Sequence, residues 1–311
     1  MRIACLGECM IELSGSPLER RFGGDTLNTA LYLARLLSSA PEPVAYISAL
    51  GDDPLSRDML ARWREEGLDT ERVAVRPGEL PGLYLVELDP DGERRFFYWR
   101  DNSAARRHFA TVEDFTPWLD RRRTDALYLS GISLALFPGQ RREAFLDALE
   151  GFRAEGGQLW YDNNFRPALW HAAEARAAQE RMLAMTDIAL LTLDDECQLH
   201  GLRDAARVAR NALDSGCREV VVKRGAEPCL LAGPDHWLEV PAQSVPRVVD
   251  TCAAGDAFAA AYLASRIQGL DERQAAENGH RLAATVIGHF GAIIPRGSMP
   301  GIDPGDPAPV R

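Results

Sequence analysis

Residues 248–258 read Val248-Val249-Asp250-Thr251-Cys252-Ala253-Ala254-Gly255-Asp256-Ala257-Phe258, which joins two apolar residues to an alanine-rich helical pattern over 254–268. The small residues at 253–255 let the backbone approach a ligand, and the first amides of the helix have no acceptor within it. Such a helix start binds anions and suits the charge on a transferring phosphoryl group. Asp256 could then accept the proton of an attacking hydroxyl. Alternatively, Asp250 or Thr251 caps the helix and Asp256 only complements its dipole.

Similar junctions recur along most of the chain, because short apolar runs alternate with helical patterns. The apolar runs, which predict buried parallel strands, are residues 3–6, 44–50, 126–129, 158–161, 188–191 and 219–222. The helical patterns are residues 26–37, 54–66, 140–155, 172–185, 202–215, 254–268 and 271–288. This alternation predicts an α/β fold built of βαβ units around a parallel sheet. Ligands of such sheets bind beyond the carboxyl ends of the strands.

One segment departs from the alternation and predicts a lid. Residues 82–88 and the aromatic run 94–99 flank the turn Asp89-Pro90-Asp91-Gly92, which is a hairpin pattern. With strands expected between residues 10 and 22, this hairpin would form a small sheet beside the main body. We therefore expect one domain over residues 1–300 with lid segments at about 10–22 and 71–100. A loosely packed C-terminal tail is expected over 301–311.

The composition limits the possible partners. The 311 residues include 35 Lys and Arg against 46 Asp and Glu, a net charge of −11, which disfavours nucleic acid and anionic membrane surfaces as partners. No apolar run reaches the roughly 18 residues of a membrane span. The six cysteines form no CxxC pair and no zinc-like spacing, so we expect reduced thiols and a cytoplasmic location.

Three further motifs place polar side chains where ligands of this fold class bind. In Phe22-Gly23-Gly24-Asp25-Thr26-Leu27-Asn28, Asp25 and Asn28 are three apart, so both can face one side of a helical turn and bind the hydroxyls of a polyol. An ordinary helix cap with a glycine turn is the alternative. In residues 162–167, Arg166 follows a predicted strand and can hold a carboxylate or phosphate. Lys223-Arg224-Gly225 follows another predicted strand.

Together these residues resemble the ribokinase-like family of sugar kinases, also called the phosphofructokinase-B family, from about residue 3 to residue 300. The family's two signatures correspond to the Gly23-Gly24 segment with Asn28 and to residues 250–256. The resemblance implies a three-layer α/β/α sandwich with a small β-sheet lid, and the phosphorylation of a sugar hydroxyl by ATP with Mg²⁺. Within the family, segments such as 7–13, 98–100, 128–136 and 291–296 are similar to kinases of a keto-deoxy sugar acid.

The resemblance also implies roles for individual residues. Asp256 matches the catalytic base, and Ala253, Ala254 and Gly255 match the anion hole around it. The positions that match sugar-binding residues are Gly24, Asp25, Asn28, Tyr84, Tyr98, Arg100 and Arg166. The positions that match the nucleotide site are Asn164, Thr192, Lys223, Gly225 and Asn278. Asp195 matches a residue that organises the metal indirectly, through water.

Three departures from the family pattern affect these assignments. Ala253 replaces the first glycine of the Gly-Ala-Gly-Asp motif, which we expect to be tolerated provided that its φ stays negative. Pro228 stands where many members have a glycine in the nucleotide loop. Thr192 and Asp195 replace the Asn-x-x-Glu pair, and their shorter side chains could still act through water.

An acid substrate has its own sequence signal. A sugar carboxylate that is desolvated under a closed lid needs a cationic partner, and Arg100 and Arg166 would supply it. The alternative for Arg100 is a surface cation beside Asp101. A kinase of a neutral sugar such as fructose, and a non-catalytic sugar or nucleotide sensor, remain alternative functions. The aromatic lid could also pair with a second subunit, so a homo-oligomer is possible.

Overall fold

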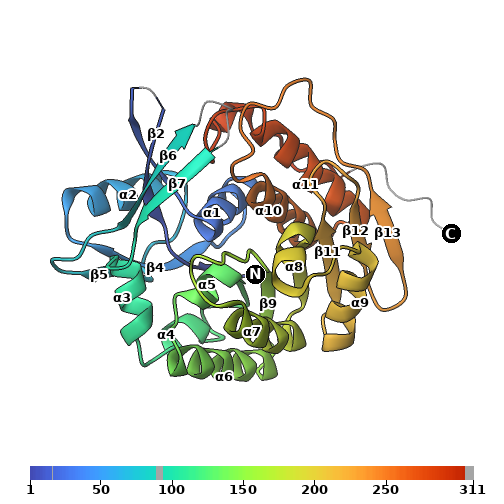
Figure 1. Cartoon of the computed structure of the whole chain (residues 1–311), viewed down its shortest axis with the longest axis horizontal. Helices are drawn as coiled ribbons and strands as arrows, with labels where there is room; N and C mark the ends of the chain where they lie inside the picture. The colour runs from blue at the N-terminus through green and yellow to red at the C-terminus, as the bar shows by residue number, and fades with distance from the viewer. Residues whose placement is uncertain (16, 89–93, 305–311) are drawn as a thin grey trace.

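The computed structural model describes residues 1–15, 17–88 and 94–304 and confirms the three-layer α/β/α prediction (Figure 1). The main sheet has the strand order β13-β12-β11-β10-β9-β8-β1-β4-β5. Its strands are β1 (Ile3–Leu6), β4 (Ala45–Gly51), β5 (Val73–Arg76), β8 (Ala126–Ser130), β9 (Gln158–Asp162), β10 (Ile188–Thr192), β11 (Glu219–Lys223), β12 (Cys229–Ala232) and β13 (Trp237–Val240). Pairing is parallel from β11 to β5, whereas β12 and β13 add antiparallel strands at one edge.

Side chains that alternate along the strands build one apolar core on each face of the sheet. Tyr128 lies in the core of one face, and its neighbours Leu127 and Leu129 lie in the core of the other. The first face is covered by α1 (Asp25–Leu36), α2 (Pro54–Glu65), α10 (Ala254–Ile267) and α11 (Glu272–Val286). The second is covered by α3 (Ala104–Thr111), α4 (Thr116–Leu119), α5 (Gly131–Ala135), α6 (Gln140–Ala154), α7 (Ala172–Met185), α8 (Leu193–His200) and α9 (Ala205–Ser215).

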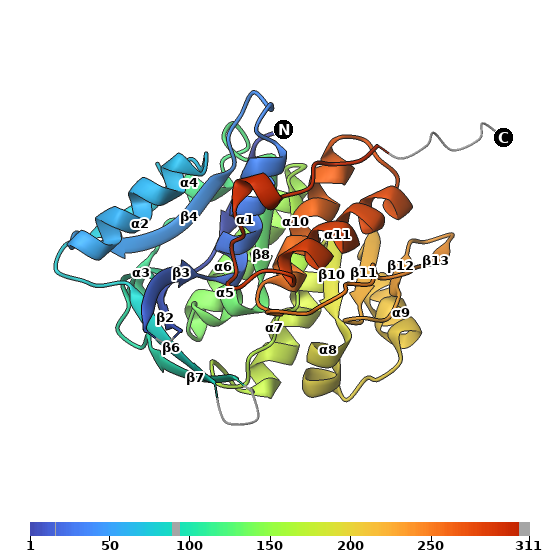
Figure 2. The same cartoon turned by 90° about the horizontal axis from the view of Figure 1, so that it is seen from above.

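The lid is a separate small sheet that projects from the body (Figure 2). Its order is β3 (Glu19–Gly23), β2 (Met10–Ser14), β6 (Gly82–Leu88) and β7 (Arg94–Trp99). The predicted hairpin is confirmed in its two strands, while its turn at 89–92 lies outside the described residues. Residues 73–76 of the predicted lid segment instead form β5 of the main sheet, because Val73 is buried in the core beside β4.

The predicted strands and helices of the main body are confirmed to within three residues at each end, but several short elements were not predicted. Helices α3, α4, α5 and α8 and strands β12 and β13 span four to eight residues, too few for a clear period. Helix α9 begins at Ala205 rather than 202 because Asp204 caps it, accepting a hydrogen bond of 3.0 Å from the Ala206 amide. Among the described residues, no helix is long and apolar enough to cross a bilayer.

The described part of the predicted tail is packed on α11. The backbone carbonyl of Asp303 accepts a hydrogen bond from Asn278 Nδ2 at 3.0 Å. The carboxylate of Asp303 forms an ion pair with Arg281 at 2.9 Å. Gln274 Nε2 donates to the Pro304 carbonyl at 2.6 Å. The prediction of loose packing is therefore wrong for residues 301–304, because polar side chains of α11 bind their backbone. Residues 305–311 lie outside the described part of the chain.

Candidate active site

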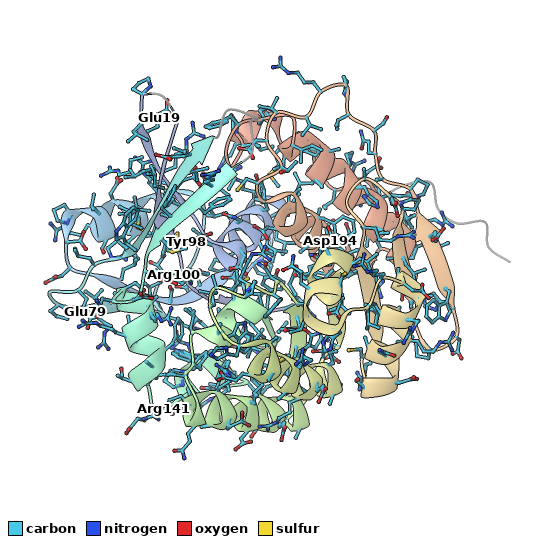
Figure 3. The ribbon with its side chains drawn as sticks, viewed as in Figure 1. Glu19, Glu79, Tyr98, Arg100, Arg141 and Asp194 are labelled. Carbon is cyan, nitrogen blue, oxygen red and sulfur yellow. The ribbon has the colours of Figure 1, made fainter. Side chains whose placement is uncertain are left out.

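Polar side chains from five elements meet at the carboxyl ends of the parallel strands, beside the lid. Ser130, Asp162 and Lys223 end β8, β9 and β11. Asp25 begins α1, and Asp256 lies in the first turn of α10. This is where a parallel sheet brings strand ends together and where ligands of α/β sheets bind. Figure 3 shows Tyr98 and Arg100 where β7 returns from the lid to the body.

The start of α10, where the sequence predicts an anion hole, has a different backbone from the one expected. Ala253 is left-handed, with φ 58, so the expectation of a negative φ is wrong. That conformation costs alanine about 1–2 kcal/mol relative to an ordinary one. The chain takes it to turn into the helix without a side-chain cap, because Asp250 accepts instead from the amides of Cys252 (2.7 Å) and Gly291 (2.9 Å).

The helix-capping alternative for this motif is consequently not supported. Within the described ranges, the amides of Gly255 and Asp256 have no hydrogen-bond acceptor. Two donors at the positive end of a helix are thus available to an anion.

Asp256 has the properties of a general base. Asn28 Nδ2 donates to its Oδ2 at 2.8 Å, which orients the carboxylate. Asp256 is partly exposed, but its partial burial raises its pKa, and the negative charge of Asp25 adds to the rise. The resulting pKa is about 7. A carboxylate with this pKa is suited to take a proton near neutral pH. Asn28 Oδ1 is buried with no partner in the described structure, so it is available to a ligand hydroxyl.

Asp25 is held by two side chains from neighbouring strand ends. Its Oδ2 accepts from Ser130 Oγ at 2.5 Å and from Asn164 Nδ2 at 2.7 Å. Asn164 reaches it from a backbone with φ 21, a value that asparagine tolerates better than most residues. Asn164, which was assigned to the nucleotide, thus contacts a residue assigned to the sugar. Ser130 was not predicted, although its place after the predicted strand 126–129 could have indicated it.

Lys223 brings a positive charge to the start of α10. Its Nζ donates to Asp162 Oδ2 at 2.6 Å and would lie 3.6 Å from a Cβ added to Gly255. Lys223 is therefore near the amides of α10, as expected for a residue that contacts phosphates. Gly225 has φ 61 and open space around it, in a loop that Arg224 ties to the Pro228 carbonyl. Asp162 was missing from the predicted site.

Arg166 and Asp195 form an ion pair close to these residues. Arg166 Nη1 lies 3.1 Å from Asp195 Oδ1, and half of the Arg166 side chain is exposed. Thr192 is fixed through its backbone, which exchanges two hydrogen bonds with the Asn163 side chain (2.9 and 3.1 Å). In the described part of the chain, no group of three or more His, Cys, Asp or Glu residues could hold a metal by itself.

The lid residues divide between the site and the lid interior. Tyr98 is half exposed, and the burial of its other half raises the pKa of its hydroxyl. The positive charges of Arg100 and Arg166 oppose this rise, so both guanidinium groups act on the hydroxyl. The Tyr84 hydroxyl donates to Glu12 inside the lid. Arg100 is buried and pairs with Glu8, whereas Asp101 pairs with Arg106 at 3.5 Å. The surface-cation alternative for Arg100 is therefore wrong.

Two other predicted residues serve the backbone. A Cβ on Gly24 would lie 2.3 Å from the Glu8 carbonyl oxygen, so this glycine permits close chain crossing. Asn278 Nδ2 donates to Ser265 Oγ at 3.0 Å. Ser265 lies nine residues after Asp256 on α10, a distance of about 13 Å along the helix axis. Asn278 Oδ1 accepts from the Asp303 amide. The structure thus does not bring Asn278 together with Asp256.

Comparisons with known proteins agree with this geometry. A model of the pfkB family of carbohydrate kinases matches residues 1–298. The 2-dehydro-3-deoxygluconokinase of Dickeya dadantii is 47% identical over 304 residues, covering 96% of this chain and 98% of the relative. That of Escherichia coli K12 is 46% identical over 305 residues, covering 96% and 99%. The solved structure of a PfkB protein from Polaromonas sp. JS666 matches with a TM-score of 0.79 at 26% identity, covering 91% of this chain and 94% of that one.

Proposed function

The chain belongs to the pfkB family of carbohydrate kinases, and we propose that it transfers the γ-phosphoryl group of ATP to the terminal hydroxyl of 2-keto-3-deoxy-D-gluconate, the 2-dehydro-3-deoxygluconate of its relatives' name. The product is 2-keto-3-deoxy-6-phosphogluconate. The observation that carries the proposal is Asp256, a carboxylate with a pKa of about 7 beside unpaired helix amides.

The acid nature of the substrate is supported by the cations near the lid. Arg100 Nε is buried and has no partner among the described residues, although Nη2 pairs with Glu8. A buried donor of this kind is unfavourable until an acceptor binds it. Arg166 acts on the same tyrosine hydroxyl as Arg100, and half of its side chain is open to solvent. Two guanidinium groups beside Tyr98 suit a carboxylate better than a neutral hydroxyl.

In the proposed mechanism, the residues of this chain position the reactants and stabilise charge. Asp256 accepts the proton of the terminal hydroxyl as its oxygen attacks the γ-phosphorus and the bond to the β-phosphate oxygen breaks. Asn28 keeps the accepting oxygen in place. The amides of Gly255 and Asp256, with Lys223 Nζ close by, stabilise the negative charge of the transferring group. Closure of the lid would exclude water and limit ATP hydrolysis.

ATP and Mg²⁺ fit the residues present. Thr192 and Lys223 end strands β10 and β11, and Gly225 lies two residues beyond Lys223. We propose that these three residues contact the nucleotide. Asp195 lies beside them, and with no protein cluster for a metal in the described ranges, Mg²⁺ would be held by phosphates and water. When bound, Mg²⁺ supplies shielding of the phosphate charge. On the sugar side we propose Gly24, Asp25, Asn28, Tyr84, Tyr98 and Arg166.

The position of the transferred phosphate tests the proposal. Purified protein is incubated with ATP, Mg²⁺ and 2-keto-3-deoxygluconate, and the product is analysed by ³¹P and ¹³C NMR. We expect phosphate on carbon 6 and one ADP per product. ATP consumption with fructose alone would favour the neutral-sugar alternative, and no consumption with any sugar would favour the sensor alternative.

Two of the expected properties stay predictions. A cytoplasmic location agrees with the buried thiols of Cys5, Cys9, Cys217 and Cys229. A homo-oligomer agrees with Phe97 and Trp99, which are 42% and 60% exposed on one face of the lid. Sedimentation velocity of the wild type and of a Trp99→Ser variant would measure the oligomeric state.

A further inference from the structure

One buried carboxylate next to the site has no part in the mechanism above. Glu8 lies between β1 and β2, where the chain enters the lid, and its side chain has no exposed surface. It accepts hydrogen bonds from Arg100 Nη2 and from Ser103 Oγ. Ser103 caps α3, where the chain has just left the lid. Glu8 thus connects the entry of the lid to its exit.

The other two chain crossings also contact Glu8. A Cβ added to Gly24 would lie 2.3 Å from the Glu8 carbonyl oxygen, and one added to Gly82 would lie 3.1 Å from its Oε1. The segment that enters β6 also contacts the segment that leaves the lid, since the Leu80 carbonyl accepts a hydrogen bond from the Ala104 amide at 2.8 Å. The segments that join lid and body therefore meet at Glu8, that of Gly24 at its backbone carbonyl oxygen and those of Gly82 and of Arg100 and Ser103 at its carboxylate.

The ion pair also determines how Arg100 is presented. A guanidinium is planar, so fixing Nη2 restricts the direction of Nε–H as well. The Nε atom of Arg100 is buried and unpartnered in the described structure. Glu8 balances the buried cation before substrate binds and leaves this donor for a second acceptor.

We propose that Glu8 is a positioning residue that orients Arg100 toward the carboxylate of the sugar acid and couples that contact to the lid. This inference rests on the proposed function, because only an acid substrate requires the oriented cation. Glu8 acts through Arg100 and Ser103 and does not itself touch the reacting atoms.

Steady-state kinetics of Glu8→Gln test the proposal, since glutamine keeps the size of the side chain and removes its charge. We expect the KM for 2-keto-3-deoxygluconate to rise by about tenfold or more, while the KM for ATP and the kcat/KM for the neutral methyl ester of the sugar acid change little. An unchanged or lower KM for the acid would overturn the proposal. Glu12→Gln is the matched control, because Glu12 is a second buried carboxylate whose partners are Tyr84 and Ser14. It should affect acid and ester by the same factor.

A double-mutant cycle separates positioning from a general structural role. If Glu8 acts through Arg100, adding Glu8→Gln to Arg100→Ala raises the KM for the acid no further, whereas additive effects would contradict the inference. If Glu8→Gln does not fold, Ser103→Ala replaces it, and we expect a smaller rise with the same preference for the acid. Wild type that cannot phosphorylate the acid refutes the proposed function. Active wild type with no acid-selective effect in these variants refutes the inference alone.

Discussion

Asn28 Nδ2 lies 2.8 Å from Asp256 Oδ2, although the two residues are 228 positions apart on α1 and α10. The pair joins the family's two signature segments, so the residue expected to bind the sugar directly orients the expected base. The oxygen of the same amide, Asn28 Oδ1, is buried without a partner in the described part of the molecule. A sugar hydroxyl bound there would lie next to Asp256, the proposed base.

Replacing Asp256 with asparagine should remove activity but not the fold. We expect kcat to fall by about 10²–10⁴ because general-base catalysis is lost while the shape of the side chain is kept. Stability should rise: the folded pKa of about 7 lies above the ordinary aspartate value of 3.8, so the ionised carboxylate opposes folding as pH increases through this range. Thermal melting should show a larger gain at pH 8 than at pH 5. Normal turnover in this variant would exclude Asp256 as the base.

The pH dependence should report the same carboxylate. The kcat/KM of the wild type should decrease as pH is lowered through about 7, because Asp256 must be ionised to accept a proton. Asp25→Asn removes a negative charge that raises the pKa of Asp256, so its acid limb should move to lower pH. Weaker sugar binding by Asp25→Asn would lower kcat/KM at every pH without moving the acid limb of the pH profile. An acid limb at the wild-type pH would contradict the coupling of the two carboxylates.

Ala253 should carry backbone strain that glycine relieves. Since its φ is 58, Ala253→Gly removes about 1–2 kcal/mol of strain and adds some freedom to the unfolded chain, for a net stabilisation of about 0.5–1 kcal/mol. Urea unfolding measures this change. Ala254→Gly, one position into the helix, is the control and should destabilise by about 0.5–1 kcal/mol. Destabilisation by both variants would mean that Ala253 is not strained.

Arg100→Ala should discriminate between acid and neutral substrates. We expect a rise in the KM for 2-keto-3-deoxygluconate on the order of tenfold to a hundredfold, the range for loss of a charge-assisted hydrogen bond. The effect on a neutral sugar should be much smaller. Because the variant leaves Glu8 without its cationic partner, melting curves must accompany the kinetics. Equal effects on both substrates would exclude Arg100 as the carboxylate partner.

The sequence was sufficient for the architecture because short apolar runs alternate with long helical patterns, and it identified most residues that the fold brings together. Asp256, Asn28 and Lys223 follow recognisable strand ends or helix starts. Contacts between side chains from distant elements could not be predicted: the pairing of Glu8 with Arg100, of Asp162 with Lys223, and of the tail with Asn278 depend on tertiary packing. The left-handed Ala253 was also beyond sequence rules, since alanine rarely takes that conformation.

A coupled assay of ADP release tests the central claim most directly. Purified protein with Mg²⁺ and ATP is supplied in parallel with 2-keto-3-deoxygluconate and with D-fructose, and kcat/KM is measured for each. The account predicts turnover of the sugar acid with a kcat/KM at least about a hundredfold above that for fructose, which corresponds to about 2.7 kcal/mol of discrimination. Equal or preferred use of fructose, or no ADP release with either sugar, would contradict it.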